Sequence, residues 1–273
     1  MNEGKFMIGF NTGSNTSLLQ QVQNKQESIL EKLSSGKRIN SAADGAAAQQ
    51  IIDRLTTQVE GNRQSISNAY DGVSLTQVAE GGLAGINEDV NRIRELSVQS
   101  GNGLLNDADR RAIQSEVTQL QENISQTIEQ TEFAGKSLLS SDGSIDFQVG
   151  ANAGQKIAVG TQDVAAGLSD ILNVDLSTAQ GAEDALALAD TATEFVGSAR
   201  AELGATQNQF ESAARNLTQA DVNISAARSR IQDTDFAQAA SENATASILS
   251  QTSLAVQSMA NQQQGQVLSL LNG

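Results

Sequence analysis

The sequence predicts a mainly α-helical fold of long coiled-coil helices with one small β-hairpin, and three observations indicate it. Apolar residues recur at every seventh position in the C-terminal third, no proline occurs in 273 residues, and one short segment alternates apolar with polar residues. Proline inside a helix costs about 3 kcal/mol, so its absence fits long unbroken helices. The heptad period predicts coiled-coil helices, and the two-residue period predicts the hairpin.

The N-terminal segment is expected to form one helix of a coiled coil. Leu19, Val22, Ile29 and Leu33 lie at the spacing of a coiled-coil seam. No charged residue occurs from position 6 to position 24. We therefore expect this uncharged helix to pack against other helices and not to stand alone in water.

A second seam predicts a long helix in the next segment. We expect the glycine-rich EGGLAG to loosen this helix before the seam resumes. The seam residues are Ile52, Leu55, Val59, Asn62, Ile66, Ala69 and Val73, then Leu83, Ile86, Val90 and Ile93.

A further helix is expected to begin after Asn106. Asparagine is a good N-cap, Asp109 occupies the third helical position, and Asp107 suits the positive end of the helix dipole. The expected apolar face is Ile113, Val117, Leu120, Ile124 and Ile128.

The period changes near residues 144–160, where a β-hairpin is predicted. Two alternating runs flank the glycine-rich GANAGQ, which suits a turn. Residues 164–184 are interpreted as a linker, with the next helix starting near Glu183. The alternating apolar residues are Ile145, Phe147 and Val149, then Ile157 and Val159.

The C-terminal third predicts one long helix with a heptad seam. Large residues fill one seam position and small ones the other, so a partner helix can approach closely. The large residues are Val196, Leu203, Phe210, Leu217, Ile224 and Ile231, and the small ones are Ala199, Thr206, Ala213, Ala220 and Ala227.

The C-terminal tail contrasts with the rest of an acidic chain. The formal net charge is -15, yet no charged residue occurs from Asn243 to Gly273. Leu249, Val256, Val267 and Leu270 lie at seam spacing within this tail. Burial of so few apolar side chains offsets only part of the backbone entropy lost on folding. We therefore expect both termini to be disordered in the free subunit and ordered in a polymer.

Composition excludes several classes of function. Without His or Cys, the chain lacks the usual general base, thiolate nucleophile and metal ligands, and we expect neither a cofactor nor a catalytic site. A pI of 4.3 argues against a nucleic-acid partner. The sequence contains no run of 18 apolar residues, so we expect no membrane insertion. The N-terminus lacks the pattern of a cleavable signal peptide.

Two charged pairs in the sequence are candidate sites. Asp233 and Asp235 are a weak metal pair without a third ligand, and a joint between helical domains is the stronger interpretation. Lys37 and Arg38 suit a turn or a subunit contact.

Five sequence blocks stand out along the chain. They are LSSGKRINSAADGAAAQQI from Leu33, NRIRELSVQSGNG from Asn91, FQVGANAGQ from Phe147, RSRIQDTDFA from Arg228 and VLSLL from Val267. In this order the blocks resemble bacterial flagellin in a minimal form without large outer domains. The resemblance begins at Met7, so either residues 1–6 are an extension or Met7 is the true start. Asp44–Gly45 stands where the family has a double Asp.

The resemblance implies an inner coiled-coil domain of residues 1–42 and 232–273, with a rod-like helical domain of residues 43–231 around it. It implies an extracellular filament subunit that polymerises with itself after type III export, with an export chaperone, a filament cap and junction proteins as partners. In members recognised by toll-like receptor 5, the contact positions match Arg92, Leu96 and Glu116 here; helix packing is an equally good interpretation of these three residues.

Three other functions were considered. A flagellar hook–filament junction protein resembles flagellin at both ends. A chemoreceptor-like signalling coiled coil shares the Ala-, Gln- and Ser-rich heptads, but the β segment at residues 144–160 and the lack of a membrane span argue against it. An exported enzyme would need a carboxylate pair or a Ser–Lys arrangement, and neither stands out.

Overall fold

The computed structural model describes the backbone of residues 3–271, and side chains are described for residues 17–263 and Gln266. The chain divides into two compact units: unit 1 holds residues 1–57 and 223–273, and unit 2 holds residues 58–222. The mainly helical fold class with a small β segment is confirmed. The expected domain boundaries at residues 42 and 232 stay a prediction.

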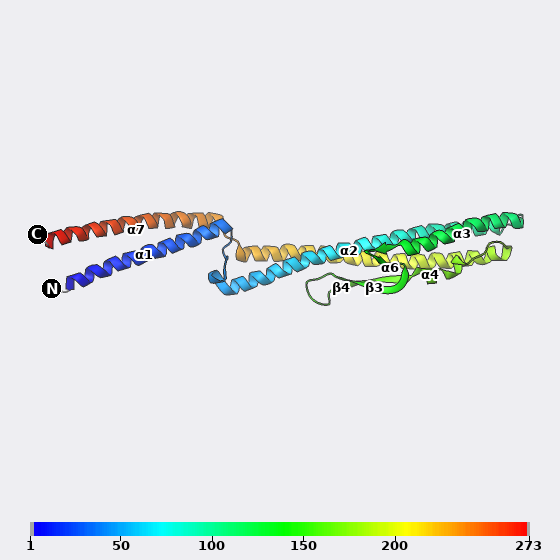
Figure 1. Cartoon of the computed structure of the whole chain (residues 1–273), viewed down its shortest axis with the longest axis horizontal. Coiled ribbons are helices and arrows are strands. Elements are labelled where there is room, and N and C mark those ends of the chain that lie inside the picture. The colour runs from blue at the N-terminus through cyan, green and yellow to red at the C-terminus, as the bar shows by residue number, and fades with distance from the viewer. Residues whose placement is uncertain (1–2, 272–273) are drawn as a thin grey trace. The chain divides into compact units, whose positions relative to one another are not determined.

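Unit 2 is built on three long helices that lie side by side (Figure 1). These are parts of α2 (Ala42–Ser100) and α6 (Ala179–Gln232) together with α3 (Asp107–Gln130). α3 begins as predicted: Asn106 accepts hydrogen bonds from the backbone of Ala108 and Asp109, and the Asp109 carboxylate accepts one from the Asn106 backbone. This reciprocal pair is a capping box, which satisfies donors that a helix start leaves free.

The predicted hairpin forms from β3 (Ser140–Gln148) and β4 (Lys156–Asp163), which pair antiparallel. Ile145 lies opposite Val159, and Phe147 lies opposite Ile157, so the apolar residues share one face. A second, unpredicted hairpin joins β1 (Glu132–Phe133) to β2 (Lys136–Ser137). Its turn residues, Ala134 and Gly135, both have positive φ, as a two-residue hairpin turn requires.

The expected linker at residues 164–184 is wrong in one respect, because much of it is packed core. It contains two short helical turns, α4 (Val164–Gly167) and α5 (Ser169–Leu172), and α6 begins at Ala179 rather than near Glu183. Val164, Leu168 and Leu176 are almost fully buried. A short segment of this kind shows no helical or strand period, yet it closes one side of the core.

The core of unit 2 is continuous along its helices. Parts of the expected seams lie in it, including Ile86, Val90 and Ile93 from α2 and Val196 and Phe210 from α6. The early part of the α2 seam, from Ile52 to Ile66, and the late part of the α6 seam, from Leu217 to Ile231, lie outside this core. Phe210 packs edge-on against Phe147 of the hairpin, with ring centroids 5.4 Å apart and an interplanar angle of 87°. The hairpin therefore covers the helix seam as a third layer.

The segment EGGLAG does not loosen α2, which is helical through it. A Cβ on Gly82 would lie 2.6 Å from the Thr131 hydroxyl oxygen and 3.1 Å from a Leu139 methyl carbon. The glycine at this position is therefore required by close packing, and it does not mark a break.

Unit 1 contains the terminal helices α1 (Glu3–Ser35) and α7 (Phe236–Leu271), which lie side by side (Figure 1). α1 ends at Gly36, whose positive φ of 67° suits the left-handed residue after a helix. The segment after α1 pairs with the segment before α7: the Thr234 backbone donates to the Gly36 carbonyl (3.0 Å), and the Arg38 backbone donates to the Gln232 carbonyl (2.6 Å).

Candidate assembly surface

The side of α7 that is covered within the chain is small and polar. Ala239 and Ala246 are buried, and Asn243, Ser250, Ser253 and Gln257 are half-buried at the same three- and four-residue spacing. The Asn243 Oδ1 and Gln257 Oε1 atoms are buried without a hydrogen-bond partner in the described part of the chain. An unpaired buried acceptor costs about 1–3 kcal/mol, so this contact is a poor stabiliser.

Large apolar residues of α7 are exposed instead. Ile248, Leu249, Val256 and Met259 are 64%, 50%, 43% and 57% exposed. At 100° per residue these four positions fall on one side of the helix, and we call them the α7 outer stripe. Phe236 and Leu254 are also exposed, at 67% and 51%, but lie on a different side of the helix. The stripe lies wholly within the uncharged stretch of α7.

Leu249 and Val256, the two C-terminal seam residues whose side chains are described, therefore do not pack against the chain's own α1 as an inward-facing seam would. Leu249 and Val256 are about half exposed, because the alanine and serine side of α7 takes the inner position. Val267 and Leu270 lie outside the residues whose side chains are described. On α1 the expected seam does face inward: Ile29 is 4% exposed, and Leu19, Val22 and Leu33 are half-buried.

The uncharged stretches of α1 and α7 begin at the same level of unit 1. Lys25 is the first charged residue after the uncharged part of α1, and Glu242 is the last charged residue of α7. Both line one groove of about 440 Å³, together with Val22, Ala246 and Leu249. Where the side chains are described, the uncharged stretches of the two helices therefore begin next to each other.

The candidate metal pair Asp233 and Asp235 has structural roles in the joint of unit 1. Asp233 accepts a hydrogen bond from the Ser229 hydroxyl (2.6 Å), and its backbone pairs with that of Lys37. Asp235 is the N-cap of α7, accepting from the backbone of Ala237 and Gln238. The joint interpretation is therefore the one that the geometry supports.

Arg38 ties the same joint to the end of α6. Its guanidinium Nη2 donates to the Ile231 carbonyl at 2.8 Å and to the Arg230 carbonyl at 3.4 Å. A cation at these carbonyls suits the negative end of a helix. Lys37 and Arg38 thus lie in the connection that follows α1, as the turn interpretation expects.

The three positions matched to receptor contacts differ in exposure: Arg92 and Glu116 are at the surface, and Leu96 is buried. Arg92 donates through Nε and Nη2 to Glu116 at 2.9 and 2.7 Å, and through Nη1 to Glu95 at 2.9 Å. These carboxylates raise the pKa of Arg92, Glu116 first. Leu96 is only 2% exposed, so its place among the contacts is corrected: it packs in the core of unit 2.

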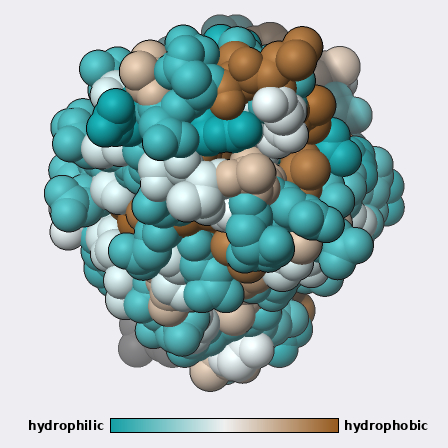
Figure 2. Space-filling model, turned by 90° about the vertical axis from the view of Figure 1, so that its right-hand side faces the viewer, coloured by the Kyte–Doolittle hydropathy of each residue, from teal (hydrophilic) through white to brown (hydrophobic). Residues whose placement is uncertain are grey.

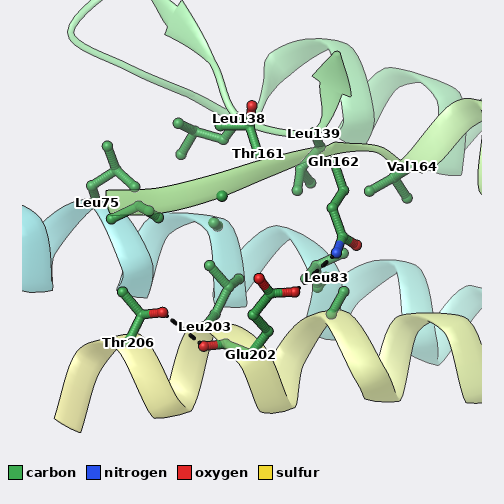
Figure 3. Close-up of a pocket in the computed structure, with 14 residues that line it drawn as sticks. Leu75, Leu83, Leu138, Leu139, Thr161, Gln162, Val164, Glu202, Leu203 and Thr206 are labelled. Carbon is green, nitrogen blue, oxygen red and sulfur yellow. Dashed lines mark hydrogen bonds between the residues drawn. The ribbon is translucent and has the colours of Figure 1, made fainter. Parts of the chain in front are cut away.

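A small, mainly apolar pocket lies in unit 2 beneath β4 (Figure 3). Leu75 and Leu83 of α2, Leu138, Leu139 and Leu203 line it. The Gln162 amide donates to the Glu202 carboxylate across the rim at 3.1 Å. The enclosed space is about the size of a water molecule, so the pocket is a packing gap between β4 and the helices and not a ligand site.

The described residues offer little for a metal site or a membrane span. No group of three or more metal-ligating side chains occurs among them. None of the described helices has the length and apolar character needed to cross a bilayer. The end of unit 2 that carries the connection between α2 and α3 is mainly hydrophilic, with scattered apolar patches (Figure 2).

A packed helical rod and terminal helices with exposed apolar side chains define a structural protein of the self-associating kind. Two protein-family models match the chain: "Bacterial flagellin N-terminal helical region" matches residues 11–144, and "Bacterial flagellin C-terminal helical region" matches residues 186–271. The chain belongs to the bacterial flagellin family, and its function is that of a structural subunit of the flagellar filament.

Individual relatives agree over nearly the full chain. Flagellin of Bacillus subtilis (strain 168) is 38% identical, with 89% of this chain and 91% of the relative covered. The flagellar filament 30.7 kDa core protein of Treponema maltophilum is 36% identical, with 89% and 91% covered. The chain therefore spans about nine tenths of the length of these relatives.

Solved structures agree in fold. The crystal structure of Bacillus cereus flagellin has a TM-score of 0.52 at 26% identity and covers 59% of this chain and 94% of its own. A putative flagellar hook-associated protein from Vibrio parahaemolyticus has a TM-score of 0.60 at 14% identity, covering 70% of this chain and all of its own. The second likeness shows the fold alone, and the junction-protein alternative gains no support from it.

Proposed function

We propose that subunits join through the uncharged halves of α1 and α7, with the α7 outer stripe covered by helices of neighbouring copies. The observation that carries this proposal is the outward orientation of Ile248, Leu249, Val256 and Met259 on the part of α7 that has no charged residue. Exposed apolar groups that gather on one face mark an interaction surface in soluble proteins. The expected seam residues Val267 and Leu270 extend the same uncharged stretch and are included in the proposal.

The weakness of the contact between α1 and α7 supports assembly as the missing source of stability. Among described residues of these two helices, only Ile29, Ala239 and Ala246 are buried. Three such side chains contribute far less than the conformational entropy lost by two long helices. The disorder of the termini in the free subunit therefore stays our prediction, and neighbours in the filament would supply the burial that the single chain lacks.

An uncharged, weakly stabilised tail also suits export and a chaperone. We propose that the subunit passes unfolded through the flagellar type III apparatus, with an export chaperone on the C-terminal region until then. The filament cap and the junction proteins would contact the same terminal helices at the two ends of the polymer. The acidic remainder of the chain keeps the finished filament soluble.

A contact with toll-like receptor 5 is proposed only for Arg92 and Glu116, which are exposed on neighbouring helices of unit 2. A receptor carboxylate would compete with Glu116 for the Arg92 guanidinium, because one guanidinium offers a limited set of donors. The core position of Leu96 limits it to supporting the helix beneath them. We propose no catalytic activity, since the family is a structural one.

Deletion of residues 243–273 tests the assembly proposal. We expect the shortened chain to keep a cooperative unfolding transition from unit 2 but to form no filaments. Circular dichroism would follow the helices, and negative-stain electron microscopy after seeding would follow the polymer. Long filaments from the shortened chain would contradict the proposal. A shortened chain without any cooperative transition would be replaced by the point variants described below.

A further inference from the structure

The side chains that mild oxidants attack are confined to the ends of this chain. The sequence contains three methionines, at positions 1, 7 and 259, and neither cysteine nor tryptophan. With no thiol present, the methionine thioether is the group that peroxide oxidises first. The core of unit 2 is built from Leu, Ile, Val, Ala and Phe, so the rod offers a peroxide no comparable target.

Met259 is accessible in the single chain and lies within the surface proposed for assembly. Its side chain is 57% exposed, and it shares the α7 outer stripe with Ile248 and Val256. Thioethers adapt to irregular apolar contacts, which suits a position between subunits. Oxidation would convert this group to a polar, chiral sulfoxide.

We propose that Met259 is an oxidation site that controls whether a subunit can join the filament. This inference rests on the proposed role of the α7 outer stripe. In the free subunit a peroxide reaches Sδ and produces a subunit that assembles poorly. In the filament neighbouring helices cover Sδ and protect it, so oxidation removes unassembled subunits and spares assembled ones.

The chemistry is a two-electron oxygen transfer from hydrogen peroxide. The Sδ lone pair attacks one peroxide oxygen, an S–O bond forms as the O–O bond breaks, and the other oxygen leaves as water after proton transfer. Sulfur is oxidised by two electrons and the peroxide is reduced. Methionine sulfoxide reductases reverse the step, with a dithiol reductant supplying the two electrons and the oxygen leaving as water.

A sulfoxide on this stripe should weaken assembly strongly. A polar group buried without a partner costs about 1–3 kcal/mol, which corresponds to roughly a fivefold to 150-fold change in an equilibrium constant. We therefore expect the critical concentration for polymerisation to rise by at least about fivefold.

The three methionines can be followed separately by trypsin digestion. Lys5, Lys25 and Arg230 place Met1, Met7 and Met259 in three different tryptic peptides, because no Lys or Arg follows Arg230. Mass spectrometry of peroxide-treated free subunits and filaments then gives an oxidation rate for each sulfur. We expect Met259 to react at least about tenfold more slowly in filaments, since covering Sδ removes the attack path.

Assembly of treated subunits gives the functional readout. Met259→Leu keeps an apolar side chain without sulfur, so treated Met259→Leu should polymerise like untreated protein. Met259→Gln imitates the polar sulfoxide and should polymerise poorly without any oxidant. Treatment of oxidised wild type with methionine sulfoxide reductase and dithiothreitol should restore assembly.

Two results would overturn the inference: wild type with fully oxidised Met259 that assembles normally, or treated Met259→Leu that fails as wild type does. Failure of the underlying assembly proposal is a separate result. It would appear as normal polymerisation of the Ile248→Ser/Val256→Ser variant, which involves no oxidant.

Discussion

Unit 1 and unit 2 use the same helical periodicity with opposite results. In unit 2, α6 brings Val196, Leu203 and Phe210 to a seam that the hairpin and the segment after it cover. In unit 1, α7 brings Ala239 and Ala246 to its inner face and leaves Ile248 and Val256 outside. Both sequences form helices, but only unit 2 has a third layer to close its seam. The comparison teaches that heptad spacing specifies a helix, and that the layers around it decide whether it is stable alone.

The sharpest test of this contrast is the double variant Ile248→Ser/Val256→Ser. Complete burial of such a side chain is worth about 1.5–3 kcal/mol, and the polymer would bury only the exposed part of each, so we expect the critical concentration to rise by at least about tenfold. Ile248 is 64% and Val256 43% exposed in the single chain, so unfolding of the free subunit should change less than assembly does. Sedimentation of polymer and thermal unfolding of monomer would measure the two effects.

The matched control for that variant is Gln251→Ser/Ser258→Gln. Both positions are exposed on α7 and, at 100° per residue, lie away from the outer stripe. We expect this control to polymerise like wild type. Equal loss of assembly in both double variants would remove the distinction between the faces of α7.

The converse variant, Phe210→Ala, should destabilise the free subunit. Phe210 is fully buried against Phe147 and Gly72, and removal of a large buried aromatic side chain typically costs about 3–5 kcal/mol. Urea unfolding followed by circular dichroism would measure the loss. Val222→Ala, at a position that is 57% exposed on the same helix, should change the free energy of unfolding by less than about 0.5 kcal/mol. Similar losses in both variants would argue against a closed core in unit 2.

Arg110→Met tests a buried cation in unit 2. Arg110 is 7% exposed, and its guanidinium donates to the carbonyls of Ser100 and Asn102, where α2 ends. Methionine keeps much of the bulk but leaves these carbonyls without their donor, so we expect a loss of about 2–3 kcal/mol in unfolding free energy. Arg111→Met changes an exposed neighbour and should have almost no effect. A stable Arg110→Met would show that water replaces the guanidinium without cost.

Features with local rules were predictable from the sequence. The Asn106 cap follows from a side chain that reaches its own backbone, and the pairing of Ile145 with Val159 follows from alternation and a glycine-rich turn. The α6 seam follows from a seven-residue period that continues through Phe210. Each of these signals depends on residues close together in sequence.

Features that depend on distant residues were not predictable. Leu168 and Leu176 are buried by helices far along the chain, and no period in their own segment indicates it. Arg110 contacts the end of α2, which only the turn between the helices brings near. At the candidate site, seam spacing correctly places Leu249 and Val256 on one face of α7. Spacing does not determine which face of α7 packs against α1, and in the single chain a different face does.

The smallest expected effect concerns pH and the joint of unit 1, where Asp44 accepts hydrogen bonds from the backbone of Ser41 (2.9 Å) and Asn40 (3.0 Å). These bonds, Ser41 first, lower the pKa of Asp44 below its ordinary value. A lowered folded pKa means that the stability contribution is present above the ordinary pKa and is lost as pH falls through the folded value.

Asp44→Asn should therefore differ from wild type above about pH 4 and converge with it in stronger acid, as thermal unfolding at a series of pH values would show. Ser41→Ala removes only the hydroxyl contact at 3.2 Å and should keep most of the pH dependence. Parallel pH curves for Asp44→Asn and wild type would mean that the joint does not depend on this carboxylate, and that unit 1 relies still more heavily on its neighbours.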